Sequence, residues 1–239
     1  MSSSPPPSSP VTSTAPAPGD KAAARAVLGE YRVVQTRVDA FFAAVLHRHP
    51  TQLQCQSGCH GCCQAGLSVS AIEAAAIRDY VQSLPEDQRA QLRAHVRPGA
   101  ALNRAALGSA AAAASCALLT RDGRCTIYPA RPLVCRSQGL PLAYEAALIP
   151  EGALRFRAKD GRAVVVCPLN FSSTADPAGL PSPSVEPAAA DILDGERLDV
   201  ILALLNHRYI DSLGADRSTA TARVPLADVV LDCNEPAPT

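Results

Sequence analysis

One stretch constrains this chain more than any other: Cys55-Gln56-Ser57-Gly58-Cys59-His60-Gly61-Cys62-Cys63. It holds four of the nine cysteines in a protein of 239 residues, and two of them are adjacent. Thiolates are strong, soft ligands for zinc, copper(I) and the iron of iron–sulfur clusters. Gly58 and Gly61 allow the tight backbone turns that bring several sulfur atoms toward one point. We therefore interpret this stretch as part of a metal site.

A buried helix face is the structural alternative, because Cys55, Cys59, Cys62 and Cys63 have the spacing of one side of a helix. Two glycines inside such a helix would each cost about 0.5–1 kcal/mol relative to alanine, which favours the metal site. A closed disulfide framework fits an odd number of cysteines poorly. Residues 1–18 lack the charged and apolar regions of a secretory signal, so we expect a cytoplasmic protein with reduced thiols.

Charge and hydropathy exclude several kinds of partner. Lys plus Arg and Asp plus Glu number 22 each, so no basic excess points to nucleic acid or to a membrane surface. No run of 18 apolar residues predicts a membrane span. Aromatic residues make up only 4 % of the chain, which predicts a thin core that a bound metal would help to stabilise.

The composition divides the chain into five parts. Residues 1–19 are rich in serine and proline and are typical of a disordered tail. We expect a cysteine-cluster metal-binding domain at 20–171 and a Pro/Ser-rich loop at 172–190. A C-terminal helix within 191–214 should pack on that domain, and 215–239 should form a tail.

Hydrophobic periodicity predicts a mainly α fold with one or two short β-hairpins, in a small domain closed by a cysteine-lined metal site. The expected helices run from Asp20 to about His49, from Ser70 to about Val81, from Pro85 to about Leu107, and from about Glu196 to Leu213. Asp20 is a suitable N-cap, and Ser70 with Glu73 forms a capping box. Pro98 should break or kink the third helix.

Two Asp-Gly pairs predict hairpins. Asp122-Gly123 suits a type I′ turn, in which both residues have positive φ and Cys125 faces Thr120. In that register the sulfurs of Cys116 and Cys125 would lie roughly 13 Å apart, unless the ladder breaks early. Asp160-Gly161 predicts a second hairpin, and Val229-Val230-Leu231 has the composition of a strand.

Eight cysteines are candidate ligands once Cys233 is set aside in the C-terminal tail: Cys55, Cys59, Cys62, Cys63, Cys116, Cys125, Cys135 and Cys167. Eight thiolates could hold two zinc ions, one zinc ion with spare thiols, or an iron–sulfur cluster. Adjacent side chains diverge, so Cys62 and Cys63 do not easily chelate one ion. One would bind a first metal, and the other would face a second metal, a partner sulfur or the protein interior.

Two motifs carry a resemblance to a known family. The first is Cys55-x3-Cys59-x2-Cys62-Cys63, and the second is Asp122-Gly123-Arg124-Cys125-x-Ile127-Tyr128-x2-Arg131-Pro132-Leu133-Val134-Cys135-Arg136. Over about residues 50–170 the chain resembles the CxxCxxCC or YkgJ-type cysteine-cluster proteins, described as zinc- or iron-chelating domains. Its first gap is three residues, where the family name implies two.

The resemblance implies metal ligands at Cys59, Cys62, Cys63, Cys125 and Cys135, followed by Cys55, Cys116 and Cys167. It also implies that an enzyme is conceivable, because the family includes relatives of a flagellin lysine methylase. Arg131 and Arg136 flank the last ligands and would either offset the negative charge of a thiolate site or clamp an anionic substrate. His60 is an alternative ligand, whereas His47 and His49 suit the negative end of the first helix.

These observations lead to a hypothesis and two alternatives. The hypothesis is a protein that chelates zinc or iron through cysteine thiolates, with a structural or accessory role, and whose partner is the metal ion. The first alternative is an iron–sulfur redox protein or metalloenzyme, distantly methylase-like. The second is a thiol switch at Cys62-Cys63.

Overall fold

A computed structural model describes residues 19–56, 58–108, 114–149, 156–173, 182–183 and 186–233 of the chain. The fold is mainly α with small sheets of a few strands, as the sequence predicted. Part of the Pro/Ser-rich loop expected at 172–190 lies outside the described residues. No helix in the described ranges is long and apolar enough to cross a membrane.

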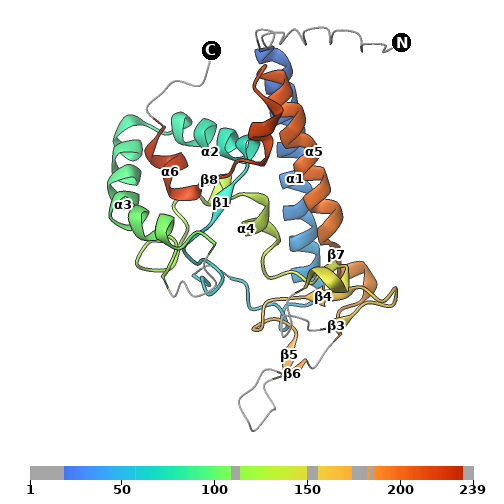
Figure 1. The fold of residues 1–239 in the computed structure, drawn as a ribbon. Helices are drawn as coiled ribbons and strands as arrows, with labels where there is room; N and C mark the ends of the chain where they lie inside the picture. The colour runs from blue at the N-terminus through green and yellow to red at the C-terminus, as the bar shows by residue number, and fades with distance from the viewer. Residues whose placement is uncertain are drawn as a thin grey trace, which may run out of the picture.

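Two long helices, α1 (Lys21–Arg48) and α5 (Gly195–Ser212), lie side by side and run in opposite directions (Figure 1). The Asp20 side chain caps α1 by accepting hydrogen bonds from the amides of Ala22 and Ala23, as predicted. Asp194 caps α5 in the same way. Their apolar faces share one core that includes Tyr31, which is fully buried. The pair therefore forms one side of the molecule (Figure 1).

A second group of helices contains α2 (Ala71–Ser83), α3 (Glu86–Ala105) and α6 (Leu226–Leu231) (Figure 1). The capping box of Ser70 and Glu73 starts α2, as predicted. We predicted a break or a kink at Pro98; α3 continues through it to Ala105, so a break there is wrong. Contacts with α6 and the Asn103 side chain, which bonds to Gly99 and Ala117, hold this end of α3 in place.

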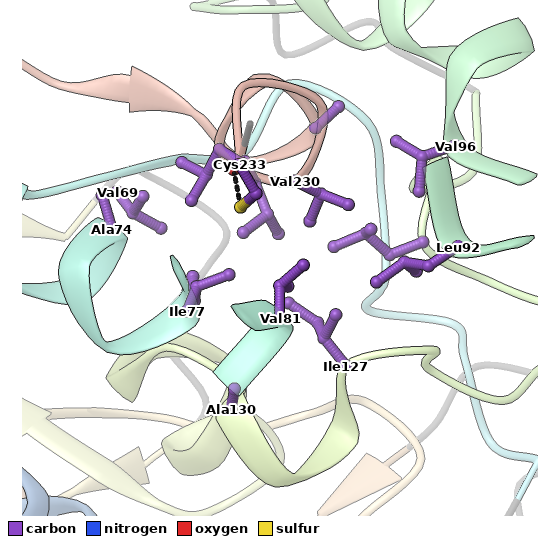
Figure 2. Close-up of a cluster of buried hydrophobic side chains, with 14 of the residues drawn as sticks. Val69, Ala74, Ile77, Val81, Leu92, Val96, Ile127, Ala130, Val230 and Cys233 are labelled. Carbon is purple, nitrogen blue, oxygen red and sulfur yellow. Dashed lines mark hydrogen bonds between the residues drawn. The ribbon is translucent and has the colours of Figure 1, made fainter. Parts of the chain in front are cut away.

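The C-terminal segment is part of this second core. Val229 and Val230 are fully buried in α6, so the strand expected at 229–231 is wrong and the segment is not a peripheral tail. Figure 2 shows Val230 and Cys233 pointing toward Ile77 and Val81 among buried aliphatic side chains. Packing against α2 and α3 outweighs the strand preference of a β-branched run. The Cys233 thiol donates to the carbonyl of Val229, 2.8 Å away.

The strands are short and pair in small sheets. β1 (Ser68–Val69) pairs antiparallel with β8 (Val224–Pro225). A four-stranded sheet has the order β3-β4-β2-β7, from β3 (Phe156–Arg157), β4 (Ala163–Val165), β2 (Leu142–Tyr144) and β7 (Leu193–Asp194). β3 and β4 form the hairpin predicted around Asp160-Gly161, and β2 and β7 are parallel. β5 (Ser172–Ser173) pairs with β6 (Ser182–Pro183).

The short helix α4 (Leu133–Ser137) lies between the two helical groups (Figure 1). The sequence did not predict it, because five residues after Pro132 are too few for a periodic signal. The described part of the chain also contains four 3-10 helices: η1 (Tyr128–Ala130), η2 (Ala146–Leu148), η3 (Ala189–Asp191) and η4 (Arg217–Thr221). The cysteine-bearing loops run between these elements.

Candidate metal centre

The first cysteine group is a series of turns. The amide of Cys59 donates to the carbonyl of Gln56 at 2.9 Å, and the amide of Cys63 donates to the carbonyl of His60 at the same distance. Gly58 has a φ of +90°, a conformation that side chains disfavour. None of the described residues from 51 to 66 is helical, so the helix-face alternative for this group is wrong.

The second cysteine group lies directly beside the first. The amide of Cys116 donates to the carbonyl of Cys63 at 3.0 Å, and Gln64 forms an antiparallel bridge with Ser115. The chain then turns, because the amide of Leu119 bonds to the carbonyl of Cys116. The helical hairpin of α2 and α3 is therefore an insertion between two segments that meet in space.

The turn at Asp122-Gly123 differs from the predicted type I′ hairpin. Gly123 has a φ of +76°, whereas Asp122 is not among the residues with positive φ. Thr120 bonds to Arg124 across three residues, which shifts the register so that Leu119, and not Thr120, faces Cys125. Because the ladder ends at the turn after Cys116, the thiols of Cys116 and Cys125 are close enough to interact electrostatically.

Cys135 is carried on α4, and α4 is anchored by two buried charged residues. The Glu73 carboxylate accepts a hydrogen bond from the amide of Leu133 at 3.1 Å. The Arg136 guanidinium pairs with Asp39 of α1 and donates to the carbonyls of Arg131 and Pro129. The sequence signalled Glu73 as a helix cap only, so its link to α4 was missed.

Cys55 and Cys167 are brought together by Asn170, a buried residue that the sequence analysis missed. The Asn170 side-chain amide donates to the Cys55 sulfur at 3.2 Å and to the carbonyl of Gly139 at 2.7 Å. Its carbonyl oxygen accepts from the amide of Gln54, and its backbone amide bonds to the carbonyl of Cys167. A single asparagine in a loop carries no sequence signal for this role.

The thiols of these loops influence one another's ionisation. Burial, together with the neighbouring thiols of Cys116 and Cys125, raises the pKa of Cys135 to about 12, while the charge of Arg131 opposes this rise. The hydrogen bond between Cys62 and Cys63 raises the pKa of Cys62 and lowers that of Cys63. A thiol with a raised pKa, such as that of Cys135, stays largely protonated near neutral pH, and a metal that binds it must displace the proton.

Each of the eight candidate cysteines therefore contacts or interacts with at least one other, whereas Cys233 lies apart in the second core. All nine cysteines have free thiols. Across the described ranges, no group of three or more His, Cys, Asp or Glu side chains is arranged to hold a metal ion as it stands. The donor chemistry suits a thiophilic metal, but the sulfurs would have to draw closer around it.

The two arginines of the second motif have different surroundings. Arg136 is buried and fully engaged by Asp39 and backbone carbonyls. Arg131 stacks on the Tyr128 ring, with its guanidinium carbon 3.7 Å from the ring centroid, and its charge acts on Cys62, Cys125 and Cys135. Its buried Nε has no hydrogen-bond partner among the described residues. Arg131 is thus the arginine that can offset charge at the thiols.

The structure places His47, His49 and His60 in different surroundings. His60 is exposed, and its Nδ1 lies 2.8 Å from the carbonyl of Gly58. His49 lies just after α1, where its Nε2 is 2.8 Å from the buried carboxylate of Asp191, which also pairs with Arg48. His47 is exposed in the last turn of α1. His49 therefore has a buried side-chain partner, Asp191, that the sequence did not indicate.

Comparison with known protein families gives a match to one segment of the chain. Residues 54–148 match the family model CxxCxxCC, described as a "putative zinc- or iron-chelating domain". No curated protein matches the chain. No solved structure matches it either. The match includes seven of the eight candidate cysteines and ends before Cys167. The resemblance noted in the sequence is thereby confirmed: residues 54–148 are similar to the CxxCxxCC family.

Proposed function

We propose that this protein chelates zinc or iron through cysteine thiolates, and that the bound metal fixes the loops between its two helical groups. The observation that carries the proposal is the gathering of eight cysteines from separate chain segments, while the ninth lies in an apolar core. The proposed ligands are drawn from Cys55, Cys59, Cys62, Cys63, Cys116, Cys125, Cys135 and Cys167.

The chemistry of the donors supports this function. Thiolates bind zinc and iron strongly, and a structural metal contributes directly to the free energy of folding. The loops that carry these thiols contain few regular hydrogen bonds, with short turns and isolated bridges in place of strands. When bound, the metal would supply cross-links between loops that the thin apolar core does not provide.

Residues around the thiols position the sulfur atoms and offset their negative charge. Asn170 orients the Cys55 sulfur, and Glu73 and Arg136 fix the position of α4 and hence of Cys135. Arg131 brings a positive charge to thiolates that, four to a zinc ion, would carry a formal charge of −2. We propose a reducing, cytoplasmic setting, because there the thiols remain free to bind metal.

The test is thermal unfolding of purified protein with and without a strong chelator. A metal present at about 1,000 times its dissociation constant stabilises a fold by about 4 kcal/mol, which shifts the midpoint by roughly 8–16 °C at this chain length. We expect a loss of that size for the wild-type protein, and little further loss on chelation for Cys62→Ser or Cys135→Ser.

Cys233→Ser is the matched control, because Cys233 is buried away from the other cysteines and serine can keep its hydrogen bond to Val229. This variant should respond to the chelator as the wild type does. Full thermal stability and full metal content in both Cys62→Ser and Cys135→Ser would refute the proposed function. A brown protein with acid-labile sulfide would instead favour an iron–sulfur centre on the same thiols.

A further inference from the structure

Helix α3 meets the chain segment that carries Cys116 through three residues, here called the α3 stripe. His95, Gly99 and Asn103 are spaced four residues apart, which places them along one side of the helix. Four helical residues rise about 6 Å, and two residues of extended chain span up to about 7 Å. Residues two apart on the segment can therefore face residues four apart on α3.

Two members of the stripe fix the later part of this segment. The Nε2 of His95 donates to the carbonyl of Leu119 at 2.9 Å, because a carbonyl can only accept. A Cβ at Gly99 would lie 2.9 Å from the Cβ of Ala117, so glycine permits a close approach of helix and segment. The segment therefore lies directly against the helix backbone at this point.

Asn103 holds the backbone on both sides of Cys116. The residue is only 5 % exposed. Its side-chain amide donates to the carbonyl of Ser115 at 3.4 Å, and its side-chain oxygen accepts from the amide of Ala117 at 3.2 Å. The amide of Cys116 itself bonds to the carbonyl of Cys63 at 3.0 Å. The backbone is thus held at three consecutive residues, with Cys116 in the middle.

The helix that carries the stripe is itself well fixed. Its Leu92 and Val96 point into the second core (Figure 2). At its end, Ala106 meets the chain that follows the first cysteine group, because a Cβ at Gly66 would come within 2.4 Å of the Ala106 carbonyl oxygen. Both cysteine-bearing segments therefore rest on α3.

We propose that the α3 stripe sets the Cys116 thiol beside Cys63 for metal binding, so that its three members are positioning residues. This inference rests on the proposed function and gives the inserted helical hairpin a task in it. A ligand that is already held in place loses less conformational freedom on binding. Residues that orient metal ligands typically change metal affinity by about 10- to 100-fold.

The experiment measures the zinc affinity of the full chain by competition with a chromophoric chelator under reducing, oxygen-free conditions. Gly99→Ala should weaken binding about tenfold, because the new methyl group pushes Ala117 and its neighbour Cys116 away from the helix. Alanine favours a helix over glycine, so α3 itself should persist. Adding Ala117→Gly should restore most of the affinity, because it removes the Cβ that the new methyl group meets. Gly29→Ala is the matched control and should bind as the wild type does, since a Cβ at Gly29 of α1 has nothing within 4 Å.

A second comparison tests whether the stripe acts through Cys116. Cys116→Ser should weaken zinc binding at least as much as Gly99→Ala, and Gly99→Ala should cause no further loss in the Cys116→Ser background. Independent, additive losses would overturn the proposal. His95→Ala removes an exposed side chain without overpacking the helix, and it should weaken zinc binding about threefold through the lost hydrogen bond.

The remaining outcomes separate this inference from the proposed function. Wild-type zinc affinity in both Gly99→Ala and His95→Ala would overturn the inference and leave the proposed function intact. So would a failure of Ala117→Gly to restore any affinity to Gly99→Ala. Apoprotein variants that unfold at lower urea but bind zinc normally would assign the stripe to stability alone and also overturn it. A wild type that binds neither zinc nor iron would overturn both.

Discussion

Glu73 offers the sharpest test of how the fold positions the cysteines. Its carboxylate is 2 % exposed and accepts hydrogen bonds from the Ser70 amide and hydroxyl, both at 3.0 Å, and from the Leu133 amide at 3.1 Å. One side chain thus caps α2 and fastens α4, which carries Cys135. Replacing it by alanine would leave both amides without a partner in a buried position.

The size of the effect follows from those bonds. A buried amide that loses its partner costs about 1–3 kcal/mol, so the two amides together predict a loss of about 4 kcal/mol for Glu73→Ala. The Ser70 hydroxyl can rotate toward another acceptor and adds little. At this chain length, 4 kcal/mol corresponds to a lowering of the unfolding midpoint by roughly 8–16 °C.

Urea unfolding followed by circular dichroism, with the metal-loaded protein, measures this loss. Glu86→Ala is the control, because Glu86 lies at the start of α3 with a side chain 68 % exposed, and its removal should change stability by less than about 1 kcal/mol. A Glu73→Ala variant within 1 kcal/mol of the wild type would refute the view that this carboxylate ties α2 to α4.

Three further predictions concern Asp191, Gly139 and Arg131. Burial alone would raise the pKa of Asp191, but hydrogen bonds from His49 and Arg48 outweigh it and hold the pKa below its usual value. The carboxylate therefore stabilises the fold above about pH 4, and that stabilisation is lost as pH falls through the lowered pKa. Asp191→Asn should cost about 2 kcal/mol at neutral pH, with a smaller difference in acid; equal urea midpoints at neutral pH would contradict this. Gly139→Ala should destabilise more than Gly161→Ala, since both glycines have positive φ and strain of about 1–2 kcal/mol, but only Gly139 lies against a sulfur. Equal urea midpoints for the two alanine variants would count against that packing. Arg131→Met should weaken zinc binding about tenfold in competition with a chelator, and Arg131→Lys should weaken it less; unchanged affinity in both would exclude charge compensation.

Helix starts were predictable because their signals are local. Asp20 and the Ser70–Glu73 capping box begin α1 and α2 where the sequence placed them, since a cap acts on amides two or three residues away. The last long helix ends close to the predicted Leu213, and Gly214 directly after its cap has a φ of +64°. For these elements the sequence alone was sufficient.

Elements decided by distant contacts were not predictable. The β-branched residues Val229 and Val230 favour a strand by local propensity. They form part of a helix because they pack against buried side chains of α2 and α3. Pro98 would disrupt an isolated helix, yet packing against α6 keeps α3 continuous. At Asp122-Gly123 a single positive φ and a three-residue turn replaced the predicted two-residue turn, which changed the partner of Cys125.

The candidate site likewise combines features that the sequence predicted with features that only the fold reveals. Cysteine spacing predicted eight candidate ligands, and the family match covers seven of them. The contact of Asn170 with Cys55 and the turn after Cys116 have no sequence signature. The roles of Arg131 and Arg136 could not be separated either, because only the fold shows that Asp39 faces one of them closely.

The most direct test of the central claim is the metal content of the full chain, purified without oxygen or chelator and measured together with its visible spectrum. The account predicts stoichiometric zinc or iron, and retention of that metal in Cys233→Ser. A folded, reduced protein that contains no stoichiometric metal and takes up none on reconstitution would contradict it.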